Sequence, residues 1–489
     1  MLGWRSEMQL RHSILYLLAH GIPALAAFLT LALYTRWINP DAYGIYTTLL
    51  VVANSANIIL FNWLYVAIMR YWHDSGFKET ELHSITLMVL AIGTVLILGL
   101  ATIYFAVTGD GLVAAALASL MISNAIYSAY QRINSISLQA ERYLLVEVCR
   151  VVLTTLLGIG LVWLGYSWHG ILIATSLGFL LIPLLSPHFW QYFWRYPKNI
   201  NYINVLKLIK YGLPLSLTFM LLEIIHTTDR VLLSWLVGLE AAGQYAVAFS
   251  LPFQLLILVG STVNVAAYPL ILKVLEQQGE AAAKAKLADY LLVLFGLLLP
   301  SYFGLMAISH DFMPLLIGDT YLPVSLRLLP SIGLLLLINA LYLFHTSLAF
   351  QIAQQTRKTV LVVAVAAVLN VLLNLILIPY YGIEGAIIAS LIAYLVCVFY
   401  GHTLSMRYFK LPIPWLEVVK LFLAAGLMLI LLNSLPLGHG LLEGLLRILL
   451  GAIFYLITIC LLDVGGIKFI LVNFFKNVNK RNENTNYQP

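Results

Sequence analysis

Long apolar stretches separated by short polar segments dominate the chain. Several contain no Asp, Glu, Lys or Arg: Leu82–Gly109, Ala241–Leu272, Tyr290–His310, Thr359–Ile383, Gly385–Met406 and Leu421–Leu442. Each exceeds the roughly 20 residues that a helix needs to cross a bilayer core. The strands of a membrane barrel would instead show about ten residues of alternating polarity. The pattern therefore predicts membrane-spanning helices.

Hydropathy along the whole chain predicts fourteen such helices. The expected ranges are 13–37, 43–69, 84–107, 111–138, 142–165, 169–186, 208–236, 239–271, 286–308, 325–351, 358–378, 383–405, 413–435 and 441–466. Two arginines precede the first range, as in a secretory signal, but the range is too long for a signal h-region and lacks a clear cleavage site. We expect it to be retained as the first membrane helix.

Two short echoes indicate an internal duplication. The segment Asn39–Tyr46 resembles Gly238–Tyr245, with Gly44 paired to Gly243, and Gly170–Thr175 resembles Gly385–Ser390. Gly165 or Gly382 begins the turn before each member of the second echo. We expect an N-terminal lobe of helices 1–6 over residues 1–205, a C-terminal lobe of helices 7–12 over 206–405, and two extra helices over 406–475. Duplicated lobes around a central cavity are typical of transporters, and the polar tail 476–489 is expected to be disordered and cytoplasmic.

Composition agrees with an all-α integral membrane protein. Charged residues make up 10% of the 489 residues, hydrophobic residues 62%, and the mean hydropathy is +0.93; a soluble domain has about 25% charged residues. The three cysteines, Cys149, Cys397 and Cys460, fall inside predicted helices at unrelated spacings. They indicate neither a disulfide framework nor a metal site.

The basic charge is distributed unevenly about the predicted helices. With the N-terminus inside, 21 of the 27 Lys and Arg residues lie on the cytoplasmic side, and four lie outside: Arg36, Arg230, Arg327 and Arg447. This asymmetry predicts cytoplasmic termini. The net charge of +6 is therefore attributed to topology, and no nucleic-acid partner is expected.

Helix seven carries the most prominent charged group at membrane depth. Glu223, His226 and Arg230 are spaced i, i+3 and i+7 on one face, and Asp229 lies at its margin. Ionisable groups inside the bilayer are costly unless they are wet or paired. This face is the leading candidate for the lumen, although Glu223 pairing with His226, and Asp229 with Arg230 or another helix, is the structural alternative.

Two further arginines are candidates for binding a phosphate group of the substrate. Arg150 lies three residues after Glu147 in helix five, so it can form an intrahelical ion pair or hold a pyrophosphate bidentately. Arg70 lies at the inner end of helix two, where a topology anchor is the simpler interpretation.

Neutral polar residues form stripes on three helices. They are spaced three, four or seven apart: Asn124, Ser128, Gln131 and Ser135; Ser250, Gln254, Ser261 and Asn264; and Asn370 with Asn374. Such stripes often join helices. Many donors and acceptors with few charges would equally suit sugar hydroxyls. No P-loop and no His/Cys metal motif is present in the sequence, so neither an enzyme nor a bound cofactor is expected.

Ordered motifs give the chain a family resemblance. Tyr211-Gly212-Leu213-Pro214, Thr228-Asp229-Arg230, Gly318-Asp319-Thr320-Tyr321 and the run Ile378–Ala386, together with the echo segments, resemble the polysaccharide-exporter or O-antigen flippase branch of the multidrug/oligosaccharidyl-lipid/polysaccharide flippase superfamily. The resemblance spans about residues 10–465.

The resemblance implies a flippase of the bacterial cytoplasmic (inner) membrane. Its substrate would be an undecaprenyl-pyrophosphate-linked repeat unit of O-antigen, capsule or exopolysaccharide, and its partners would be membrane lipids, a polysaccharide polymerase and chain-length proteins. Alternating access would be driven by an ion gradient, with the choice between proton and sodium left open. Lipid II flippases share an arginine-rich cavity that begins in helix one. Here that helix offers only His20 between Arg11 and Arg36, which argues against lipid II.

Two alternatives remain at this point. A cation-coupled multidrug exporter of the same superfamily would usually have twelve helices. A glycan polymerase or glycosyltransferase using the same lipid carrier would need a sizeable extracytoplasmic loop, and none of the predicted outer loops exceeds about sixteen residues.

Overall fold

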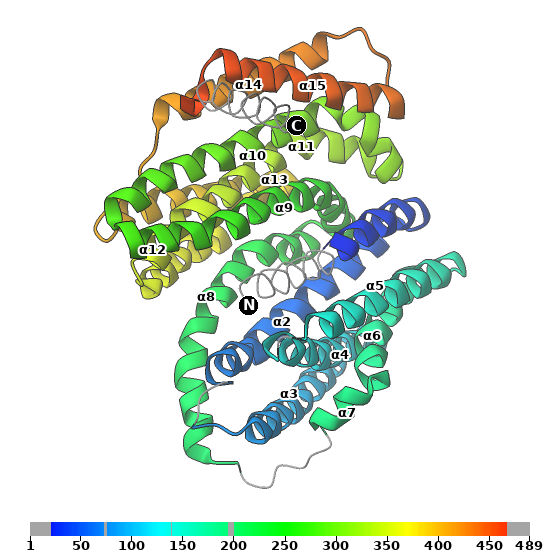
Figure 1. The fold of residues 1–489 in the computed structure, drawn as a ribbon. Helices are drawn as coiled ribbons and strands as arrows, with labels where there is room; N and C mark the ends of the chain where they lie inside the picture. The colour runs from blue at the N-terminus through cyan, green and yellow to red at the C-terminus, as the bar shows by residue number, and fades with distance from the viewer. Residues whose placement is uncertain (1–20, 73–75, 138, 194–199, 467–489) are drawn as a thin grey trace, which may run out of the picture. The chain divides into compact units, whose positions relative to one another are not determined.

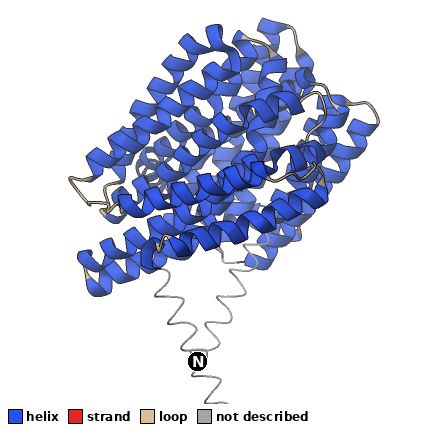
Figure 2. Cartoon of the chain, turned by 90° about the horizontal axis from the view of Figure 1, so that it is seen from above, coloured by secondary structure: helices blue, strands red, loops and turns tan. Residues whose placement is uncertain are grey.

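The chain is almost entirely helical in the computed structural model, which describes residues 21–72, 76–137, 139–193 and 200–466 (Figure 1). Every regular element in these ranges is a helix (Figure 2). Twelve of the helices are long and apolar enough to cross a membrane. One of them, α13, is interrupted by non-helical backbone at Gly382, and a further helix covers residues 21–37. The predicted all-α integral membrane fold is therefore confirmed.

The helices follow the predicted order. After residues 21–37 they are α2 Pro40–Tyr71, α3 Glu79–Thr108, α4 Gly111–Ile136, α5 Ala140–Trp163, α6 Ser167–Leu185, α7 Pro187–Phe193, α8 Tyr202–Leu236, α9 Leu239–Gln278, α10 Glu280–Leu316, α11 Leu322–Leu341, the π-helix η1 Tyr342–Thr346, α12 Ser347–Ile352, α13 Thr356–Ser405, α14 Trp415–Ser434, α15 Leu441–Leu461 and the short 3₁₀ turn η2 Val464–Gly466.

Local chemistry explains where several helices begin. Asn39 caps α2 by accepting a hydrogen bond from the Ala42 amide at 3.0 Å, and Pro40 occupies the first turn. Asp110 caps α4 by accepting from the Leu112 and Val113 amides at 3.1 and 3.0 Å. These caps satisfy backbone donors that the first helical turn leaves free.

A glycine turn precedes each member of the second echo. Gly382 interrupts α13 with φ 55° and ψ −127°, and Gly165 has φ 91° just before α6. A residue with a Cβ rarely adopts these left-handed angles, so glycine is required there. The predicted boundary between residues 378 and 383 is confirmed as this break.

The helices pack as two compact units. Unit 1 takes the chain to residue 247 together with 316–325 and 363–393, and unit 2 takes 248–315, 326–362 and the chain from 394 onward. In unit 1, α2 packs on α8, and α6 packs on α4 and α5. The lobes expected from the repeat follow other boundaries and remain a prediction. The tail 476–489, Arg11 and His20 lie outside the described residues.

The structure adds three features to the predicted pattern. The seven-residue helix α7 follows α6, and the π-helix η1 interrupts the span from α11 to α12. The third feature is the length of α9 and α10. α9 continues to Gln278, α10 begins at Glu280, and Gly279 forms the turn between them with φ 83°. The hydropathy pattern does not predict these helix ends, because their residues are polar although they are helical.

Candidate functional site

A buried polar cluster surrounds Asp229 in unit 1. The Asp229 carboxylate accepts hydrogen bonds from the Tyr245 hydroxyl at 2.9 Å, the Asn374 amide nitrogen at 2.7 Å and the Ser390 hydroxyl at 2.7 Å. Asn370 joins it by donating to Ser390 at 2.9 Å and accepting from Asn374 at 3.1 Å. We call these five residues the Asp229 cluster. It connects α8, α9 and both halves of α13.

None of the five side chains is more than 3% exposed. The three hydrogen bonds to the Asp229 carboxylate come from neutral donors. The side-chain oxygen of Asn374 is buried and accepts no hydrogen bond from the described residues. The cluster thus combines a buried carboxylate with an amide oxygen that has no donor, which is chemistry suited to a small cation or a proton.

The cluster unites three of the predicted site residues, Asp229, Asn370 and Asn374. Their burial keeps their polar atoms within the cluster, and their contact with substrate stays a prediction. Sequence reasoning did not identify Ser390 or Tyr245 as partners. Both occur in the echo segments, which offered a signal for them.

Glu223 lies two helical turns before Asp229 on α8. Its carboxylate accepts a hydrogen bond from the Ser55 hydroxyl of α2 at 3.3 Å. His226 and Arg230 lie on the same helix, and all three side chains are half-buried. The charge of Arg230 lies close enough to Glu223 and Asp229 to interact with both electrostatically. The predicted charged face thus adjoins α2 through Glu223.

Arg150 belongs to a second polar cluster, between α4, α5 and α6. Its guanidinium forms an ion pair with Glu147 and lies 5.2 Å from the ring centres of Tyr127 and Phe179. Tyr127 donates to the Glu147 carboxylate, and Gln131 donates to the Tyr127 hydroxyl at 3.0 Å. The ion-pair interpretation of Glu147 and Arg150 is therefore the one realised. Two predicted site residues, Arg150 and Gln131, meet in this cluster.

Asn124 connects α4 with α2. Its amide nitrogen donates to Asn54 at 2.8 Å, and its oxygen accepts from the Ser128 hydroxyl at 3.1 Å. Ser128 also accepts from Asn57 at 3.3 Å. The polar stripe of Asn124 and Ser128 therefore joins α4 to α2, which is the structural role that such stripes often have.

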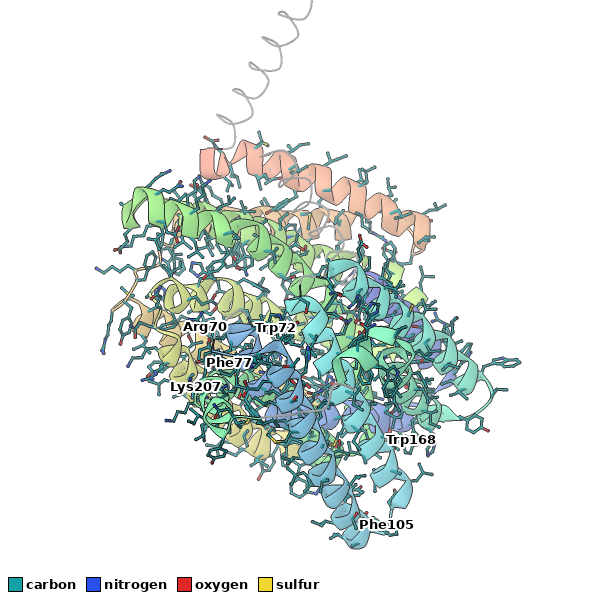
Figure 3. The ribbon with its side chains drawn as sticks, turned by 60° about the horizontal axis from the view of Figure 1, so that its bottom comes forward. Arg70, Trp72, Phe77, Phe105, Trp168 and Lys207 are labelled. Carbon is teal, nitrogen blue, oxygen red and sulfur yellow. The ribbon has the colours of Figure 1, made fainter. Side chains whose placement is uncertain are left out.

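Arg70 lies in the last turn of α2, at a polar and aromatic edge of unit 1. Its side chain is exposed, and Figure 3 shows it on the same side of the unit as Trp72, Phe77 and Lys207. The Lys207 ammonium lies 5.9 Å from the Phe77 ring centre. Aromatic and basic residues together are typical of a membrane–water interface, which fits a topology anchor.

The remaining predicted residues lie in unit 2. Asn264 on α9 lies 3.3 Å from the hydroxyl of Tyr290 on α10. Gln254 lies further along α9, and its side-chain oxygen is buried without a hydrogen-bond partner among the described residues.

Sequence reasoning missed one buried ion pair. The Asp311 carboxylate on α10 accepts from Arg447 on α15 at 2.6 and 2.7 Å, while His439 lies 3.1 Å away. Arg447 also donates to the Leu437 carbonyl at 2.9 Å. The Arg447 side chain is 6% exposed and that of Asp311 is fully buried. This pair joins α15 to α10.

An apolar groove of about 880 Å³ runs between α10, α14 and α15 in unit 2. Small residues line it, including Gly296 and Gly304 on α10 and Gly451 on α15. A side chain added at Gly304 would find its nearest neighbour, Met428, at 3.8 Å. The missing side chains therefore leave room for a slender apolar ligand.

The arrangement defines a multi-pass helical membrane protein with ionisable groups at bilayer depth. Among the described residues, no group of three or more His, Cys, Asp or Glu could hold a metal ion. The fold is similar to the lipid II flippase MurJ in an inward closed conformation, with a TM-score of 0.72 and 16% identity over 92% of this chain and 99% of that chain. It is also similar to multidrug resistance MATE family transporters of the MOP superfamily. An inward-facing one has a TM-score of 0.53 at 17% identity over 86% of this chain and 99% of that chain. An outward-facing one has 0.51 at 15% over 87% and 96%.

The sequence itself identifies the family. The family model described as "Polysaccharide biosynthesis protein" matches residues 33–326, so the chain belongs to this family. No protein of curated function matches the sequence. The resemblance to the polysaccharide-exporter branch is confirmed, and the fold is similar to those of the lipid II flippase and the MATE family transporters.

Proposed function

We propose that this protein is a flippase that moves an undecaprenyl-pyrophosphate-linked oligosaccharide repeat unit across the bacterial cytoplasmic membrane by alternating access. The repeat unit would belong to an O-antigen, a capsule or an exopolysaccharide. Membership of the polysaccharide biosynthesis family supports the glycan. The likeness of the fold to a flippase of lipid II supports a lipid-linked form of it.

The groove between α10, α14 and α15 carries the proposal. It is lined mainly by apolar side chains, with Asp289 and Arg447 as its charged members. Burying apolar surface contributes about 25 cal/mol per Å², so a polyprenyl chain would gain most from such a surface. A carrier of small drugs has no comparable need for a groove built by two additional helices.

The Asp229 cluster is our candidate for the coupling ion. A carboxylate buried at membrane depth is costly while charged. A proton, or a sodium ion bound between Asp229, Asn374 and Ser390, would neutralise it. Loss of that ion would then change the stability of the α8–α13 contact during the transport cycle.

We further propose that both termini are cytoplasmic. The excess of Lys and Arg in the loops on that side supports this orientation. A polysaccharide polymerase and chain-length proteins would act on the product at the outer face. The protein itself would not catalyse the formation of any covalent bond.

Deletion and complementation test the proposed function. Cells that lack the protein should lose one surface glycan and accumulate its lipid-linked precursor on the inner side, and the plasmid-borne gene should restore export. Unchanged appearance of the labelled repeat unit outside would reject the proposal. Altered drug sensitivity with normal surface glycan would favour an exporter, and glycan lengthening by the purified protein would favour a polymerase.

A further inference from the structure

A π-helix interrupts the long helix that continues from α11 into α12. It spans Tyr342–Thr346 in unit 2. The carbonyl oxygen of Phe344 accepts a hydrogen bond from the Tyr290 hydroxyl of α10 at 2.5 Å. π-turns cost helical hydrogen bonds and occur frequently at functional sites. Irregular backbone at membrane depth is tolerated where it is buried in protein or lines a hydrated cavity.

Buried polar atoms that have no hydrogen-bond partner among the described residues concentrate at this turn. Asn339, Tyr342 and His345 are spaced by three residues, and none is more than 2% exposed. Both amide atoms of Asn339, the Tyr342 hydroxyl and Nε2 of His345 make no hydrogen bond within the described residues. A buried polar atom left unsatisfied is strongly unfavourable. Several such atoms at one place are most often satisfied by buried water.

The second half of α13 forms the opposite wall. A side chain added at Gly401 would meet Thr346 at 3.0 Å and the Tyr342 ring at 3.8 Å, so this glycine permits the close approach of the two helices. Cys397 lies close to Tyr342, and His402 lies close to His345. We call the space bounded by Asn339, Tyr342, His345 and this wall the α11/α13 seam.

The seam changes in exposure along its length. Asn339 and Cys397 are fully buried, whereas His402 is half-buried one turn before α13 ends at Ser405. The ionisable group that interacts with His345 is His402 on α13. Around it, Cys397 lies close to Tyr342, and Tyr290 donates to the neighbouring Phe344 carbonyl. No carboxylate of the described residues is among the groups that interact with His345.

We propose that the α11/α13 seam holds a small cluster of water molecules, and that His345 exchanges a proton with bulk water through this cluster, past His402. Asn339 supplies a donor and an acceptor, and Tyr342 supplies a hydroxyl, which together match the two to four partners that a buried water requires. The proton passes from hydronium to the lone pair of a neutral imidazole nitrogen and leaves water behind. No other bond changes.

Deuterium exchange at Cε1 of the histidine ring tests this inference in the purified full-length protein. The exchange requires both water and protonation of the ring. His345 should exchange with a sigmoidal pH dependence and by roughly an order of magnitude faster than His83, which is buried beside Trp72. Asn339→Leu and His402→Leu should slow His345 several-fold. His439→Gln, which changes an exposed histidine of the same unit, should leave it unchanged.

Either of two results would overturn the inference. One is exchange at His345 that is as slow as at His83 across the pH range, and this comparison needs no variant. The other is exchange that Asn339→Leu and His402→Leu leave unaltered. The measurement uses no transport assay, so it stands or falls separately from the proposed flippase function.

Discussion

Gly44 and Gly243 face each other where α2 crosses α9. A side chain added at Gly44 would collide with the carbonyl group of Leu239, and one added at Gly243 would collide with the carbonyl group of Pro40. Pro40 and Leu239 each lie four residues before one of the two glycines, so the contact is reciprocal. The same glycines pair in the sequence echo. The two copies of the echo therefore meet in a pseudo-symmetric contact inside unit 1.

Gly44→Ala should destabilise the protein because the added methyl group has no space. Forcing extra atoms into a packed contact costs about 1–3 kcal/mol. We expect a lower melting temperature in detergent, with the same sign for Gly243→Ala. Gly99→Ala is the control, since nothing lies within 4 Å of a side chain there. A Gly44→Ala protein as stable as wild type would show that the helices separate easily at this crossing.

Asp229→Asn should disrupt the Asp229 cluster. Three donors converge on the two carboxylate oxygens, whereas an amide has one oxygen, so at least one donor loses its acceptor. The expected loss is about 1–3 kcal/mol of stability. Transport, measured below the melting temperature, should also fall and lose its response to the ion gradient.

Asp110→Asn is the matched control for this change. Asp110 is exposed and caps α4, and asparagine caps a helix equally well. Stability and ion response should therefore be retained. If Asp229→Asn is stable and still responds to the gradient, the cluster is not the coupling site.

The helices and the turns at Gly165 and Gly382 were predictable because hydropathy and backbone conformation are local properties of the chain. The partners of Asp229 were not, since Asn374 and Ser390 lie 145 and 161 residues away. The pattern identified Asn370 and Asn374 as one stripe, but nothing local indicates which helix that stripe meets.

Two other features escaped prediction for similar reasons. The π-turn at Tyr342 changes the backbone without changing the apolar composition around it. Arg447 was assigned to the outer side by charge counting alone, and its partner Asp311 is 136 residues away. In the Arg150 cluster the partner Glu147 was predictable, because helical spacing of three residues fixes it.

Glu223→Gln should impair transport while leaving abundance and melting temperature unchanged. Glutamine keeps an oxygen that can accept the Ser55 hydrogen bond but removes the charge. A fall of roughly tenfold corresponds to about 1.4 kcal/mol of lost interaction. Glu240→Gln, an exposed change at the start of α9, should export normally. Normal glycan export by Glu223→Gln would remove Glu223 from the mechanism.

Arg447→Met should destabilise unit 2 strongly. It leaves the buried Asp311 carboxylate without its guanidinium, which typically costs about 3–5 kcal/mol. A double variant, Asp311→Leu with Arg447→Met, should recover much of the stability because no unpaired charge remains. Lys286→Met, which breaks an exposed pair with Asp289, should change the melting temperature little. Equal stability of the single and double variants would contradict a dominant role for this ion pair.

Gly304→Leu should block the groove without unfolding the protein. The nearest neighbour of an added side chain is Met428 at 3.8 Å, so leucine can enter the groove volume rather than displace a helix. If a polyprenyl chain binds there, translocation of the lipid-linked precursor should fall while the melting temperature stays near that of wild type. Gly99→Leu places the same side chain on α3, where nothing lies within 4 Å, and should transport normally. Export that is equally normal in Gly304→Leu would show that the lipid chain travels elsewhere.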